Sequence, residues 1–80
     1  MIEGMIHLLG VGEGNFLVVF TSAHGTGAHR VSSREAAEHF IAQTLGCNLK
    51  PGEIDALIGG QPNSIKAQIS GDQYRDYFSD

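Results

Sequence analysis

Phe16-Leu17-Val18-Val19-Phe20 is the longest unbroken apolar run in this 80-residue chain, and it decides the fold. Its β-branched and aromatic residues favour a β-strand. Glycine-rich turn segments flank the run at residues 12–15 and 22–27. A strand without a polar position needs cover on both faces, which is typical of the centre of a sheet. The sequence therefore predicts a central strand around which the other elements are arranged.

The segments next to this run predict an antiparallel meander of three strands. Residues 5–9 form an apolar first strand, and the short glycine-rich loop after them favours a hairpin with the central strand. We expect the central strand to cover residues 15–23. A second reversal at residues 25–27 leads into a short third strand at residues 28–31.

Two helices are predicted after the meander. Ser32 fits the N-cap of the first helix, because Glu35 follows three residues later and completes a capping box. Gly46 is the expected end of this helix. Pro51 suits the first turn of a shorter second helix, which the glycines at residues 59–60 end. The apolar stripe of the first helix has a 3.6-residue period and consists of Ala36, Ala37, Phe40, Ile41, Thr44 and Leu45.

Residues 64–70 alternate strictly between polar and apolar side chains, which predicts a half-buried fourth strand. We expect this strand at an edge of the sheet, where Lys66 would discourage further pairing. The element order is then β-β-β-α-α-β. It predicts a single α+β domain over all 80 residues. The expected architecture is a two-layer sandwich, in which one long helix packs on an antiparallel sheet of three to four strands.

Composition and charge exclude several classes of function. The formal net charge is −4, and the five Lys and Arg residues are spread singly, so we do not expect direct binding to nucleic acid. The nine acidic residues leave a surface that could meet a basic groove on another protein. One cysteine excludes an intramolecular disulfide. No run approaches the ~20 apolar residues of a membrane helix, so we expect a cytoplasmic protein.

No motif predicts an enzyme or a bound cofactor. Residues 10–14, Gly-Val-Gly-Glu-Gly, begin like a dinucleotide fingerprint, but a strand follows where that motif needs a helix. Cys47 comes just after the first helix, where we expect a buried small side chain and not a reactive thiol. The chain has no nucleophile elbow and no acid pair placed by a motif.

His24 and His29 suggest an alternative, a small metal- or ligand-binding module or a minimal hydrolase. If residues 25–28 form the loop, the two imidazoles face each other with Cβ atoms about 5 Å apart and could share a metal ion. Zinc would need one or two further ligands. The remaining candidates, which no spacing connects to this pair, are His7, His39 and Cys47. Two histidines at an exposed tip are more often polar turn residues.

A compact, mildly acidic domain without a catalytic constellation resembles small phage-encoded inhibitors, including anti-CRISPR proteins. The resemblance lies in size, charge and α+β build over the whole chain. It implies a non-catalytic protein that inhibits a larger partner by occupying its surface, such as a nucleic-acid-binding effector complex. The candidate contact residues lie in the two helices and the C-terminal tail: Glu35, Glu38, Glu53, Asp55, Tyr74, Asp76 and Tyr77. A homodimer through a free sheet edge, strand one or strand four, is a further expected partner.

Two features leave the partner surface open. Tyr74, Tyr77 and Phe78 have helical spacing, which favours packing against the small core, although tyrosine is also enriched at interface hot spots. The central strand is covered on one face by the first helix, and nothing equally apolar remains for the other. If that face is open, either Leu17 and Val19 or Phe16 and Val18 would form a partner-binding surface.

Overall fold

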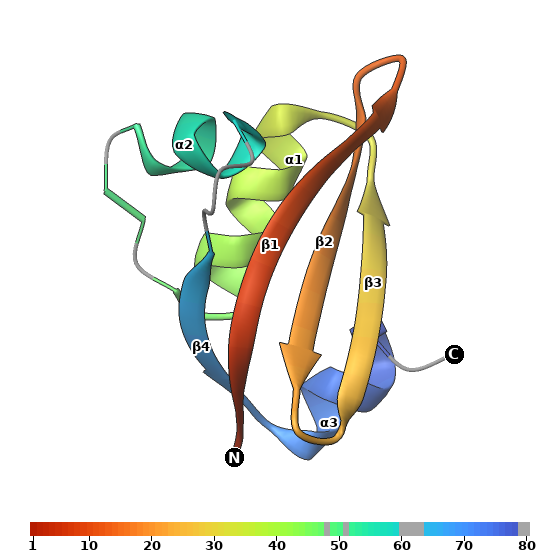
Figure 1. The fold of residues 1–80 in the computed structure, drawn as a ribbon, viewed down its shortest axis with the longest axis vertical. Helices are drawn as coiled ribbons and strands as arrows, with labels where there is room; N and C mark the ends of the chain where they lie inside the picture. Colours follow the sequence, from red (N-terminus) through yellow and green to blue (C-terminus); the bar gives the residue numbers. More distant parts are fainter. Residues whose placement is uncertain (48, 51, 60–63, 79–80) are drawn as a thin grey trace.

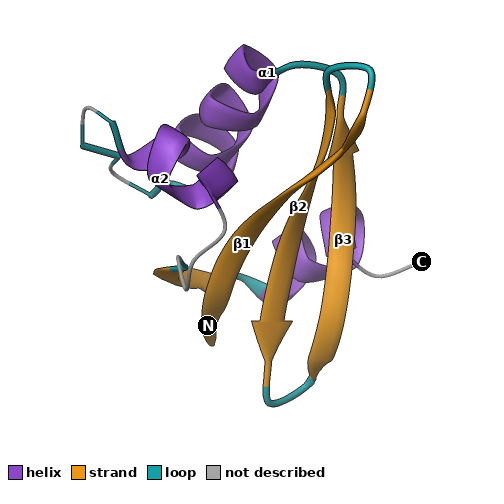
Figure 2. Cartoon of the chain, turned by 45° about the horizontal axis from the view of Figure 1, so that its top comes forward, coloured by secondary structure: helices purple, strands orange, loops and turns teal. Residues whose placement is uncertain are grey.

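The computed structural model describes residues 1–47, 49–50, 52–59 and 64–78, and it has two layers (Figure 1). A four-stranded antiparallel sheet forms one layer, and all the helices pack against one face of it (Figure 2). The strands lie in the order β3-β2-β1-β4. Their bounds are β1 Ile2–Gly12, β2 Asn15–Ser22, β3 Gly25–Val31 and β4 Ile65–Ile69. The predicted α+β class is confirmed.

The β1–β2–β3 meander is longer than the sequence predicts. β1 has 11 residues where we expected five, because its first half pairs with β4 and its second half continues the hairpin with β2. The β2–β3 turn consists of residues 23 and 24, so the reversal predicted at residues 25–27 is wrong. The Ser22 hydroxyl accepts a hydrogen bond from His24 N (3.1 Å) and donates one to Gly25 O (3.2 Å). These bonds close the turn two residues before the predicted position.

β4 lies at the edge of the sheet, as predicted, and its neighbour is β1. The antiparallel register runs from Ile2 opposite Ile69 to Ile6 opposite Ile65. Ile65, Ala67 and Ile69 share the helix-covered face, which confirms the predicted alternation. Through this pairing, the start of the chain is held against residues 65–69.

The long helix of the prediction is built from two consecutive pieces. α1 spans Arg34–His39, and the π-helical segment η1 continues it over Phe40–Thr44. Its N-cap is Ser33, whose hydroxyl accepts from Ala36 N (2.9 Å), so the cap predicted at Ser32 is one residue early. Gly46 follows the helix with a φ of +70°, as expected.

The remaining helical elements are short. α2 spans Glu53–Gly59, and the predicted start at Pro51 and stop at residue 60 lie outside the described residues. α3 spans Gly71–Gln73, and the π-helical segment η2 continues it over Tyr74–Phe78. None of the described helices is both long and apolar enough to cross a membrane.

The core lies between the sheet and the helices. Phe20 is fully buried at its centre, stacks on Phe78 at 5.4 Å and meets Tyr74 edge-on at 6.0 Å. Gly27 of β3 leaves room for Phe78, because a Cβ at residue 27 would lie 2.6 Å from its carbonyl carbon. The buried apolar residues are Ile6, Leu8, Val18, Phe20, Ala37, Phe40, Ile41, Leu45, Ile54, Leu57, Ala67, Ile69 and Phe78.

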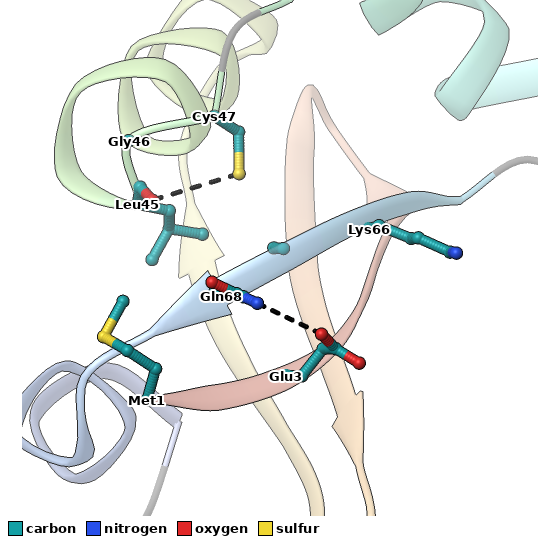
Figure 3. Close-up of a pocket in the computed structure, with 8 residues that line it drawn as sticks. Met1, Glu3, Leu45, Gly46, Cys47, Lys66 and Gln68 are labelled. Atoms are coloured by element: carbon teal, nitrogen blue, oxygen red, sulfur yellow. Dashed lines mark hydrogen bonds between the residues drawn. The ribbon is translucent and has the colours of Figure 1, made fainter.

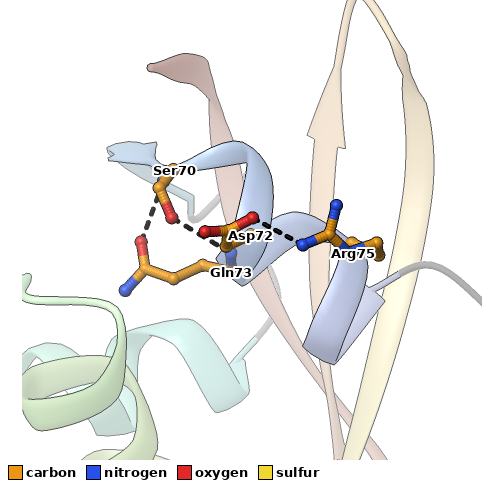
Figure 4. Close-up of polar contacts among 4 residues, drawn as sticks. All are labelled: Ser70, Asp72, Gln73 and Arg75. Carbon is orange, nitrogen blue, oxygen red and sulfur yellow. Dashed lines mark hydrogen bonds and ion pairs between the residues drawn. The ribbon is translucent and has the colours of Figure 1, made fainter.

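A capping box fixes the start of the C-terminal segment (Figure 4). Ser70 Oγ accepts from Gln73 N (3.0 Å), and Gln73 Oε1 accepts from Ser70 N (2.9 Å). Gln73 Nε2 also donates to Thr44 O (2.7 Å), which joins α3 to the end of η1. Asp72 and Arg75 form an exposed ion pair one turn apart. These contacts aim the aromatic residues of η2 at the core.

Candidate functional site

The face of the sheet that points away from the helices has no cover among the described residues. Because side chains alternate along a strand, the residues between the core positions of β1 and β2 point to this side. We call it the open sheet face; Figure 1 looks onto it. Its apolar centre, together with one histidine, consists of Met5, His7 and Leu9 of β1, Leu17 and Val19 of β2, and Ala28 of β3.

These side chains form one continuous strip. His7 stands opposite Val19, Leu9 stands opposite Leu17, and Val19 is opposite Ala28 on its other side. Leu9 is 51% exposed, and Ala28 is also exposed, whereas Leu17 and Val19 are half-buried. Directly opposite residues have Cβ atoms about 5 Å apart, so the strip crosses three strands without a break. Contiguous apolar surface of this kind marks interaction sites in small proteins.

Charged residues flank the strip. Arg30 stands opposite Leu17 and Lys66 opposite Met5, so two of the five basic residues lie on the open sheet face. Of the acidic strand residues that the structure describes, Glu3 is on this face, and it accepts a hydrogen bond from Gln68 Nε2 (3.1 Å). The open sheet face is therefore apolar with basic flanks, in a chain whose net charge is −4.

The acidic residues predicted to contact a partner lie in the helical layer. Glu35 and Glu38 are exposed on α1. Asp55 of α2 forms an exposed ion pair with Arg34, which ties α1 to α2. Glu53 accepts a hydrogen bond from Lys50 N (2.7 Å) at the start of α2. Two of these four carboxylates thus stabilise local structure, while the other two remain exposed to solvent.

The tail aromatics pack against the core. Tyr77 meets Phe40 edge-on at 5.2 Å, and Tyr74 meets Phe20. Both tyrosines are half-buried, and Phe78 is buried. Asp76 between them is exposed. The helical spacing of these aromatic residues predicted that they pack against the core, and their positions agree. Contact between the exposed part of each tyrosine ring and a partner stays a prediction.

The two histidines of the alternative metal site do not face each other. His24 is exposed in the two-residue turn, whereas His29 lies in β3 opposite Val18 on the helix-covered face. There His29 stacks on Phe40, with ring centroids 4.4 Å apart. The early turn changed the register on which the metal site depended. Among the described residues, no group of three or more His, Cys, Asp or Glu side chains could hold a metal ion.

A cleft of about 530 Å³ borders the outer edge of β4 (Figure 3). Cys47 lies in its wall, half-buried, and its thiol is 3.9 Å from Leu45 O. Burial raises the pKa of the Cys47 thiol, so the group stays protonated at neutral pH and is a poor nucleophile. The cleft is lined by Met1, Glu3, Leu45, Gly46, Cys47, Lys66, Ala67 and Gln68.

The sequence indicated only part of the open sheet face. It named Leu17 and Val19 as one of two alternatives, and the register selects that pair. It missed Met5, His7 and Leu9, because residues 5–9 are apolar on both faces apart from His7 and periodicity could not say which face is covered. The histidine was the available signal, since a lone polar residue in an apolar strand favours the solvent side.

Comparison with protein families, with curated proteins and with solved structures found no match for this chain.

Proposed function

We propose that this chain is a non-catalytic binding protein that inhibits a larger protein by covering part of its surface. The observation that carries the proposal is the open sheet face, an apolar strip on a domain whose other sheet face packs against the helices. Transfer of apolar surface from water contributes roughly 25 cal/mol per Å². An uncovered strip therefore favours association with a complementary surface.

The open sheet face is large enough to form the centre of a protein interface. With strands of 11, 8, 7 and 5 residues, the standard strand rise and spacing give a face of roughly 500 Å². A standard interface buries about 800 Å² on each partner. The apolar strip would form the interface centre, and Arg30 and Lys66 would form a polar rim. A small ligand would leave most of such a flat face exposed.

The class of partner comes from the resemblance to phage-encoded inhibitors: a nucleic-acid-binding effector complex in the cytoplasm. Docking through the open sheet face would leave the helical layer pointing outward. Glu35 and Glu38 would then present negative charge to an approaching phosphate backbone. The bound protein would block access both by its volume and by repulsion.

A charge-neutral double substitution tests the contact surface. In Leu9→Glu/Leu17→Lys the new side chains stand directly opposite each other, so they form a favourable cross-strand pair and preserve the sheet. We expect the variant to fold and to lose its partner, with affinity reduced at least about 30-fold, because buried hot-spot residues each contribute about 2 kcal/mol or more. A second variant, Glu35→Gln/Glu38→Gln, leaves the strip intact, so it should keep the affinity of wild type for the partner and block nucleic acid less, because the repulsion is weakened.

The measurement starts with affinity capture from a cell lysate and mass spectrometry. The captured protein is then purified, its affinity for each variant is measured by calorimetry, and its nucleic-acid binding is followed by fluorescence anisotropy. Wild-type protein should reduce nucleic-acid binding, and the strip variant should not. The proposal fails if the strip variant binds as tightly as wild type, or if wild type captures nothing specific.

A further inference from the structure

Among the described residues, no strand pairs with the outer edge of β4. β4 pairs with β1 on one side, and none of the backbone hydrogen bonds in the described loops, turns and caps involves residues 65–69. In an antiparallel ladder, alternate residues direct N–H and C=O groups away from the paired neighbour. Such an edge is a template for another strand. An edge lysine such as Lys66 discourages pairing, most strongly with a like charge, and the pairing described below places it opposite a neutral glutamine.

A cleft of about 530 Å³ lies against β4 (Figure 3). Lys66, Ala67 and Gln68 of β4 line it, together with Met1 and Glu3 at the start of the chain. Its other wall includes Leu45, Gly46 and Cys47 after η1, and Gly46 has no side chain to fill the gap. The cleft therefore reaches the middle three residues of β4, which is where a pairing strand would begin.

The sequence of β4 is complementary to itself. Ile65-Lys66-Ala67-Gln68-Ile69 reads as isoleucine, long polar, alanine, long polar, isoleucine in either direction. In a two-fold antiparallel pair centred on Ala67, Ile65 stands opposite Ile69 of the partner subunit, and Lys66 stands opposite the partner's Gln68. Both helical layers then lie on the same side of the sheet, as a two-fold axis perpendicular to the sheet requires.

We propose that two copies of this chain associate through their β4 edges and form one continuous eight-stranded sheet. This association uses a different surface from the partner docking proposed above and does not depend on it. The axis places the two open sheet faces side by side and pointing in one direction. The dimer would therefore present two copies of the apolar strip to one large partner, or to two partners.

Charge and facing disfavour two of the neighbouring registers. Gln68 donates to Glu3, so Lys66 of one copy approaches a neutral amide that is itself in contact with a carboxylate. A shift by two residues keeps both helical layers on the same side of the sheet. In one direction such a shift would place Lys66 opposite the partner's Lys66, which is unfavourable. A shift by one residue would turn the partner's helical layer to the opposite side of the sheet.

The β3 edge specifies a partner less well. Two of its seven residues are glycine, and glycine-rich strands fix their register weakly. Self-pairing around Ala28 would also place His29 opposite a glycine, with no apolar pair comparable to Ile65 and Ile69. The β4 edge is therefore the better candidate for pairing with a second copy of the chain.

The test is the molecular mass of the purified protein over a concentration series, measured by sedimentation equilibrium. Wild type should pass from monomer to dimer. Gln68→Lys should raise the dimer dissociation constant about tenfold or more, because two like-charge pairs form across the axis. In the monomer the new lysine keeps a favourable contact with Glu3. Gln43→Lys, the same exchange at an exposed position of η1, should leave the dissociation constant unchanged.

Charge exchange identifies the register. The double variant Lys66→Glu/Gln68→Lys places opposite charges across the axis in both pairs, so dimerisation should return to at least the wild-type level. A register with Gln68 opposite the partner's Gln68 would not be rescued, which would overturn the Ala67-centred pairing. Circular dichroism of each variant confirms that the fold is retained.

Two further results would overturn the β4 dimer. One is a protein that stays monomeric up to its solubility limit. The other is a dimer that Gln68→Lys leaves intact and that the strip variant Leu9→Glu/Leu17→Lys abolishes, since that dimer uses the open sheet face. If the dimer is overturned but Gln68→Lys still binds the captured partner, the proposed inhibition of a partner stands. If no partner is found, the measurement of molecular mass still tests the dimer.

Discussion

Gly27→Ala tests whether the C-terminal segment is part of the core. A Cβ at residue 27 would lie 2.6 Å from the carbonyl carbon of Phe78, and it would also meet the carbonyl oxygen and Cβ of that residue. Carbon atoms in ordinary contact are about 3.5–4.0 Å apart, so the backbone at Phe78 would have to move by roughly 1 Å. A smaller side chain at residue 78 would not relieve this contact, because most of it is with backbone.

Two limits bound the cost of the substitution. If η2 shifts locally, the cost is that of overpacking, about 1–3 kcal/mol. If η2 detaches instead, the protein loses the burial of Phe78, which is 4% exposed, at about 3–5 kcal/mol. The cheaper route is taken, so we expect about 1–3 kcal/mol of destabilisation. For a domain of this size that lowers the Tm by roughly 5–25 °C.

Urea unfolding followed by circular dichroism measures the change in free energy. Gly71→Ala is the control, since residue 71 has no atom within 4 Å of an added Cβ and lies in the first turn of α3. Its stability should equal or slightly exceed that of wild type. A chain ending at Tyr77 completes a double-mutant cycle, because Gly27→Ala should cost under about 1 kcal/mol once Phe78 is removed.

The reasoning is refuted if Gly27→Ala unfolds within about 0.5 kcal/mol of wild type, the range of an ordinary surface substitution. An equal penalty in the full and shortened chains would also refute it. That result would assign the cost to β3 itself and would leave the tail aromatics free to contact a partner.

Three further predictions concern the helical layer and Cys47. Ser33→Ala removes the cap that accepts from Ala36 N and should cost about 1 kcal/mol in urea unfolding; no loss would place the cap elsewhere. Arg34→Ala breaks the ion pair with Asp55, whose side chains are 52% and 60% exposed, and should cost under about 1 kcal/mol, so a larger loss would show a buried role. The Cys47 thiol should react slowly with iodoacetamide at pH 7, and faster only as pH rises, because burial raises its pKa. Because the pKa is higher in the folded than in the unfolded protein, the free energy of unfolding should fall as pH rises from the ordinary cysteine pKa through the folded pKa. A free energy of unfolding that does not change over this pH range would contradict the burial of the thiol.

Local patterns predicted the elements that local contacts stabilise. The central strand and the first helix were found because an apolar run and a 3.6-residue stripe are sequence-local signals. The hairpin ends were misplaced because one hydroxyl decides the second turn. Nothing in the residues 22–27 distinguishes a reversal at Ala23 from one at Thr26 until the Ser22 hydroxyl is seen bonding both sides of the turn.

Long-range pairing explains the other errors. The first residues of β1, including Glu3 and Gly4, do not favour a strand by composition, and they form one because β4 pairs with them. The candidate site depends on the same non-local contacts. Which side of β1 is open follows from where the helices pack, and the freedom of the β4 edge follows from the strand order. Neither is encoded in a short window of sequence.

The pairing of β1 with β4 brings together the first and the last strand of the sheet in sequence. The meander can form from neighbouring segments, whereas β4 gains its partner only by closing a loop that contains β2, β3, α1, η1 and α2. β4 is also the shortest strand, so we expect its amides to exchange through an opening that leaves the meander folded. In that opened state β1 exposes a bare strand next to its own detached β4. Two molecules at high concentration could then exchange these strands, and the same sequence that favours edge pairing would support a strand-swapped dimer of nearly identical contacts.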